Sequence, residues 1–114
     1  MYDGGMTDAH DARQCDAAVS HAFSVLGKRW NGMIVDVLGQ GELSFVGLRR
    51  AVAGISDAVL SDRLTELSDV GLVVRRVEPG PPVAVTYALT EAGSRLVPIL
   101  SQLGEWADGN LTRR

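Results

Sequence analysis

Apolar side chains recur every three or four residues along five stretches of the chain, which is the spacing of one face of an α-helix. In the first stretch they are Val19, Ala22, Phe23 and Leu26. Glycines end several stretches, and a Ser or Thr that can cap a helix N-terminus begins three of them. The pattern predicts five helices, over residues 16–26, 30–38, 44–52, 56–70 and from 90 onward.

Two short runs rich in β-branched residues lie between the fourth and the fifth of these helices. They cover Leu72–Val77 and Val83–Leu89, and the stiff turn Pro79-Gly80-Pro81-Pro82 joins them. Glu42-Leu43 could add a very short third strand. A helix followed directly by a hairpin is the layout of a winged helix-turn-helix. We therefore expect an α+β fold with a two- or three-stranded wing sheet.

The length of 114 residues favours one domain. Residues 1–14 lack periodicity and are interpreted as a flexible tail, so the domain spans residues 15–112. No apolar run approaches the ~18 residues of a membrane span, and the N-terminus does not resemble a secretory signal. A single cysteine suits a reducing compartment. We expect a cytoplasmic protein without a membrane partner.

The net charge of −3 argues mildly against a nucleic-acid partner, but its location weakens that argument. Residues 1–16 hold four acids and one base, whereas the remaining 98 residues hold ten of each. A neutral body can still present a basic face, although it neutralises few phosphates. Any DNA binding should therefore have modest affinity and a gentle salt dependence.

Several motifs, in this order, resemble the HxlR-type transcriptional regulators, which are small bacterial relatives of the MarR group. The resemblance covers about residues 15–107 and implies a homodimeric winged-helix DNA-binding protein whose first and last helices make the dimer. It also implies control of its own or a neighbouring operon, often in response to an electrophile or small molecule. The motifs are Cys15, Leu26-Gly27-Lys28-Arg29-Trp30, Phe45-x-x-Leu48-Arg49, Gly54-Ile55-Ser56-x-x-x-Leu60-Ser61-x-Arg63-Leu64-x-x-Leu67, Gly71-Leu72-Val73, Tyr87-x-Leu89-Thr90-x-x-Gly93 and Glu105-Trp106.

The fourth helix is the candidate DNA-reading element. If its leucines at 60, 64 and 67 face inward, the 100° step per residue turns a short polar face outward, where hydroxyls and methyls can meet base edges. Arg63 flanks this face, and arginines late in the third helix could hold phosphates. Arg75 and Arg76 alternate across the hairpin, so at most one faces DNA. The predicted DNA-binding set is Ser44, Arg49, Arg50, Ser56, Ala58, Ser61, Asp62, Arg63, Thr65 and Arg76.

The chain departs from the family pattern at two DNA-facing positions. Family members usually carry a base after the wing prolines, where this chain has Val83, and often another where it has Ala58. The alternatives for the predicted residues are an ordinary solvated helix face and ordinary surface arginines.

Cys15 lies just before the first helix, at the position of a cysteine that senses oxidants or quinones in several members of the family. The helix dipole would stabilise its thiolate, whereas the neighbouring Asp16 carboxylate would disfavour it. An inert thiol is the alternative.

Aromatic and apolar residues of the first, second and last helices could form an effector pocket or a dimer interface, or only core. They are Phe23, Trp30, Leu100, Leu103 and Trp106.

The leading hypothesis is a dimeric regulator, expected to act as a repressor, that binds a pseudo-palindromic double-stranded operator and responds to an oxidant or small molecule. Its half-sites should lie about one or two helical turns apart, each turn being ~10 bp. The alternative is a winged-helix module that binds protein or ligand and has weak or lost DNA binding. The residues show no catalytic constellation, metal-ligand cluster or cofactor motif, so we expect no enzyme activity, metal or cofactor.

Overall fold

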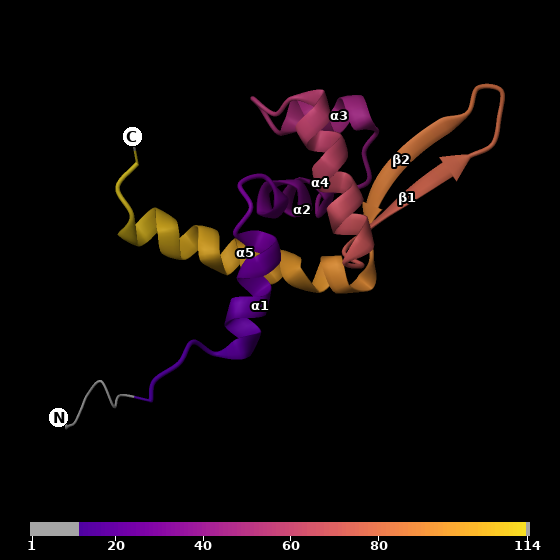
Figure 1. Ribbon diagram of the computed structural model, residues 1–114. Coiled ribbons are helices and arrows are strands. Elements are labelled where there is room, and N and C mark those ends of the chain that lie inside the picture. Colours follow the sequence, from indigo (N-terminus) through magenta and orange to yellow (C-terminus); the bar gives the residue numbers. More distant parts are fainter. Residues whose placement is uncertain (1–11, 114) are drawn as a thin grey trace.

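The computed structural model describes residues 12–113 and has five helices and a two-stranded antiparallel sheet (Figure 1). The predicted helices and hairpin are confirmed, and their boundaries agree to within a few residues. Most of the predicted tail, residues 1–11, lies outside the described residues. The elements are α1 (Ala17–Leu26), α2 (Asn31–Leu38), α3 (Phe45–Ala51), α4 (Asp57–Asp69), β1 (Val73–Glu78), β2 (Ala84–Leu89) and α5 (Glu91–Asn110).

Four of the helices begin at a side chain that accepts hydrogen bonds from the first turn. The Asp16 carboxylate accepts from the backbone N–H groups of residues 18 and 19. Ser44, Ser56 and Thr90 each accept one from the residue three positions later. Such caps satisfy N–H groups that have no partner inside the helix, which is why these residues fix where the helices start.

One hydrophobic core holds α2, α3, α4 and the base of the hairpin together. Leu60, Leu64 and Leu67 are all buried, as their spacing predicts. They pack in a cluster with buried residues of α2 and α3, among them Ile34 and Leu48. Because each buried leucine contributes about 1.5–3 kcal/mol, this stripe is the main attachment of α4 to the domain.

The hairpin projects from the core as the wing (Figure 1). Its register pairs Val73 with Leu89 at the base and Glu78 with Ala84 at the tip. Leu43 adds a single bridge to Tyr87, so the short third strand is confirmed as one residue. At the tip, a side chain on Gly80 would lie 2.0 Å from the Pro82 carbonyl oxygen, so only glycine fits this turn.

The first and last helices are poorly covered. α1 contains no buried residue, and Gly93 is the one buried residue of α5. Figure 1 shows α1 projecting away from the core and the second half of α5 extending beyond it. Large apolar side chains are exposed on both helices, among them Phe23 (59%), Ile99 (58%) and Trp106 (54%). No helix within residues 12–113 combines the length and apolar character needed to cross a membrane.

Candidate DNA-binding interface

The face of α4 opposite its leucines is exposed and short-chained. Ala58, Ser61, Asp62 and Thr65 are all exposed, as the helical step predicts. The Thr65 hydroxyl donates to the Ser61 carbonyl oxygen at 3.1 Å, which leaves its oxygen lone pairs and its methyl group available. Hydroxyl oxygens can accept from base amines and a methyl can contact thymine. The face can therefore enter a major groove without a long side chain holding the helix away.

A hollow of about 540 Å³ lies between this face and the wing. Ser61, Thr65 and Ser68 line it from α4, and Arg75 lines it from β1. Arg75 was not among the predicted DNA-binding residues. Strand alternation could have identified it, because Val73 is buried and a residue two positions later shares its face.

Arg76 lies on the other face of the hairpin, where its guanidinium is 3.5 Å from the Glu42 carboxylate. Thr86, its cross-strand neighbour, donates to the same carboxylate at 3.0 Å. Contact between Arg76 and DNA stays a prediction, and it would have to compete with Glu42. The position of Arg75 beside α4 makes it the better candidate from the wing.

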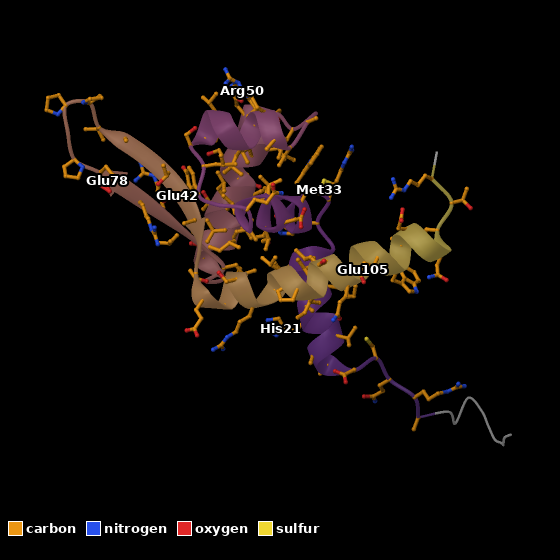
Figure 2. The ribbon with its side chains drawn as sticks, turned by 180° about the vertical axis from the view of Figure 1, so that it is seen from behind. His21, Met33, Glu42, Arg50, Glu78 and Glu105 are labelled. Atoms are coloured by element: carbon orange, nitrogen blue, oxygen red, sulfur yellow. The ribbon has the colours of Figure 1, made fainter. Side chains whose placement is uncertain are left out.

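The two arginines of α3 differ in their surroundings. Arg49 Nη1 donates to both oxygens of Asp57, at 3.0 and 3.2 Å, across the turn between α3 and α4. Both groups are substantially exposed, and such surface pairs contribute about 0–1 kcal/mol. Arg50 makes no ion pair with any other residue of the described range, and Figure 2 shows it pointing away from the domain. Of the two arginines, Arg50 can therefore bind a phosphate without first breaking an ion pair within the described range.

Arg63 is turned toward its own helix and is not free. Its side chain is 15% exposed, donates to Glu66 at 2.7 Å and also pairs with Asp62. The hydrogen bond to Asp62 is the main reason that the pKa of Arg63 is raised. A direct contact with DNA stays a prediction, and it would need these bonds to break.

Glu66 is the centre of a polar cluster behind the reading face of α4. Its carboxylate accepts from Lys28 at 2.6 Å, from Arg63 at 2.7 Å and from Asn31 Nδ2 at 3.1 Å. The hydrogen bonds from Lys28 and Asn31 are the largest causes that lower the pKa of Glu66 below its ordinary 4.5. Lys28 thus forms an ion pair with α4.

Asn31 is fully buried and was not predicted to matter. Its Nδ2 also donates to the Val25 carbonyl oxygen at 2.9 Å, whereas its Oδ1 is buried without a hydrogen-bond partner within the described residues. An unsatisfied buried acceptor costs about 1–3 kcal/mol. The sequence offered no signal for Asn31, because its partners lie six residues before it and 35 residues after it.

The serine caps and Cys15 occupy the expected places. The Ser44 and Ser56 hydroxyls accept from Gly47 N and Val59 N, so they act as helix caps and their contact with DNA stays a prediction. Cys15 is exposed, and its thiol donates to the Asp16 carbonyl oxygen at 3.4 Å.

The predicted pocket or interface residues separate into two groups. Phe23, Leu100 and Leu103 line an apolar crevice of about 530 Å³ between α1 and α5. Trp30 instead packs partly buried against the core, with the Arg29 guanidinium 4.4 Å from its ring centroid. Trp106 lies one turn beyond the crevice on the same exposed helix. The structure thus removes Trp30 from the lining of the crevice.

A buried leucine stripe, an exposed hydroxyl-bearing face and a projecting hairpin together define a winged helix-turn-helix DNA-binding protein. The sequence matches the model of the HxlR-like helix-turn-helix family over residues 25–114, and the chain belongs to that family. This confirms the family resemblance drawn from the motifs. The family consists of transcriptional regulators, so the chain is a DNA-binding regulator and not an enzyme.

Relatives and solved structures agree with this assignment. The chain is 44% identical over 87 residues to the HTH-type transcriptional regulator YodB of Bacillus subtilis (strain 168), covering 76% of this chain and 78% of YodB. The reduced form of YodB has a TM-score of 0.77 at 39% identity, covering 86% of this chain and 96% of YodB. The reduced form of the redox regulator HypR has a TM-score of 0.77 at 34% identity, covering 82% of this chain and 93% of HypR.

The lowered pKa of Glu66 predicts that the free energy of unfolding decreases at acidic pH. Because the folded pKa lies below the ordinary 4.5, the stabilisation is fully present above that value and is lost as pH falls through the lowered pKa. Glu66→Gln should be less stable than the native chain at neutral pH, and the difference should shrink on acidification. Urea unfolding at several pH values measures this, with Glu91→Gln on exposed α5 as control. A constant difference across pH would contradict the prediction.

Proposed function

We propose that the chain is a homodimeric repressor whose two α4 helices occupy successive major grooves of a pseudo-palindromic operator. The observation that carries the proposal is the exposed face of Ser61, Asp62 and Thr65 beside a hollow that Arg75 lines. Arg49 and Arg50 approach the phosphates flanking the groove and set the register, since phosphate contacts position a protein without reading sequence.

The apolar surfaces of α1 and α5 support the dimer. Exposed side chains such as Phe23, Ile99 and Leu103 lie along one crevice and its rim, and a contiguous exposed apolar surface marks an association site. A second copy of the same two helices would cover it. A two-fold dimer also matches the symmetry of a palindromic operator.

Binding responds to an oxidant or another small molecule in this proposal. HypR is a redox regulator, and YodB is known in diamide-treated and quinone-bound forms. In this chain the sensor is Cys15, whose thiol is exposed directly before the N-cap of α1. A modification there acts on α1, which carries part of the proposed dimer surface.

Arg50 provides the first test. Arg50→Ala should weaken binding to all DNA sequences alike. The slope of log affinity against log salt concentration should become shallower by about 0.9 for each phosphate that is no longer neutralised, hence by about two per dimer. Fluorescence anisotropy at several salt concentrations, on a duplex that the native chain selects from a randomised pool, measures both quantities. The control is Arg95→Ala, which removes the same charge from α5. Equal slopes for the native and Arg50→Ala proteins would remove Arg50 from the interface.

Leu103 tests the dimer. Leu103→Glu places a charge on a side chain that is 50% exposed in the single chain, so the fold should survive. A symmetric interface covers the exposed half of this side chain twice, so the dimer should lose at least about 1.5–3 kcal/mol and dissociate more readily. Sedimentation velocity and circular dichroism separate the two effects. Leu111→Glu, with similar exposure beyond the end of α5, should remain dimeric. A dimeric Leu103→Glu protein would refute this interface.

Cys15 tests the response. Diamide or a quinone should release the native protein from the selected duplex, whereas Cys15→Ser should stay bound. Anisotropy before and after treatment, followed by a reductant, gives the comparison. The same release by both proteins would exclude Cys15 as the sensor and leave the DNA-binding proposal untouched.

A further inference from the structure

The joint between α1 and the rest of the domain is narrow. α1 contains no buried residue, and the turn at residues 27–30 leads directly into α2. Figure 1 shows α1 extending away from the layer that contains α4. Apolar packing therefore supports the orientation of α1 only through its last two residues, because Val25 is partly buried against the core and Leu26 is partly buried. Polar contacts at the joint carry more weight here than they would in a well-covered helix.

Asn31 supplies such a contact with a single nitrogen atom. Its Nδ2 donates one hydrogen bond to the Val25 carbonyl oxygen in the last turn of α1 and one to the Glu66 carboxylate in α4. Both partners are acceptors, so the orientation of the amide is unambiguous. Val25 is among the last residues of α1, whose carbonyl groups lack partners inside the helix. The Asn31 side chain thus connects the end of α1 to the middle of α4.

The asparagine at this position combines two hydrogen bonds with one buried acceptor that they do not use. Its Oδ1 is buried without a hydrogen-bond partner among residues 12–113, whereas an apolar side chain of similar size would leave no such acceptor. What only the amide provides is a donor toward each of the two helices. Glu66 is in turn held by Lys28 and Arg63, so the bond ends on a fixed point of α4. Glu66 directly follows Thr65 in the sequence and lies one turn after Asp62, and both of these neighbours belong to the proposed reading face.

We infer that Asn31 is a positioning residue that sets the angle between α1 and α4, and thereby the half-site spacing that the dimer accepts. The inference rests on the proposed dimer, in which α1 forms part of the subunit interface. The orientation of α1 within each subunit then determines how far apart, and at what rotation, the two α4 helices lie. Each added base pair rotates one half-site by about 35° relative to the other, so a rigid joint selects one spacing.

The experiment compares spacing profiles. A two-half-site duplex that the native chain selects from a randomised pool is altered by inserting or deleting base pairs at its centre. Affinity is measured by anisotropy for the native protein, Asn31→Leu and Glu66→Leu. The second variant removes the acceptor on α4 and leaves the Val25 hydrogen bond in place. Ile34→Val is the matched control, because it weakens the buried face of the same helix without touching the joint.

The native protein and Ile34→Val should lose about tenfold or more in affinity when the centre changes by one base pair. A loss of this size is typical when binding at one site is coupled to binding at a second site, here the other half-site. For Asn31→Leu and Glu66→Leu the loss should fall to about threefold or less, with unchanged dimerisation. The inference is overturned if both variants lose as much affinity as the native protein when the half-site spacing changes. It is also overturned if Ile34→Val tolerates a changed spacing as well as Asn31→Leu and Glu66→Leu do. If the native chain selects no two-half-site duplex, the proposed function itself fails.

Discussion

Burial of one face of α4 is the constraint on which the rest of the structure depends. Leu60, Leu64 and Leu67 occupy the core, so the helix cannot rotate without exposing them to water. The same 100° step that turns the leucines inward fixes the opposite face at Ser61 and Thr65. The N-cap Ser56 and the glycine that follows the C-cap, Gly71 with a φ of +83°, then set where this face begins and ends. Core packing thus determines which residues a DNA groove can meet.

Charge is arranged around α4 so that little of it is free. Arg49 pairs with Asp57, Arg63 with Asp62 and Glu66, and Arg76 with Glu42. DNA phosphates would replace these carboxylates, so each contact exchanges one ion pair for another and contributes less than an unpaired arginine would. The near-neutral composition of residues 17–114 points the same way. Discrimination between sequences then has to come from the fit of short side chains to base edges.

Local signals in the sequence predicted the fold well, because the helices and hairpin are determined by residues close to one another. The serine and threonine caps, the period of the leucines and the Pro/Gly turn at residues 79–82 are all of this kind. Long-range pairings were not predictable from them. The predictions that Arg76 and Arg63 contact DNA, which stay predictions, took no account of their partners Glu42 and Glu66. Those partners become neighbours only when the chain has folded.

The contrast between a packed α4 and an uncovered α1 has a consequence for regulation. Elements with few buried contacts open or shift at low free-energy cost, whereas the core resists deformation. α1 has few buried apolar contacts apart from its end near Asn31, and it borders an apolar crevice. In the proposed regulation, a modification at α1 would therefore act on the orientation of this helix and leave the packed α4 folded. The fully buried Asn31 amide connects the two regions, so α1 and α4 share one hydrogen-bonding nitrogen. In this proposal, communication between α1 and α4 depends on the polar contacts of Asn31 rather than on apolar packing.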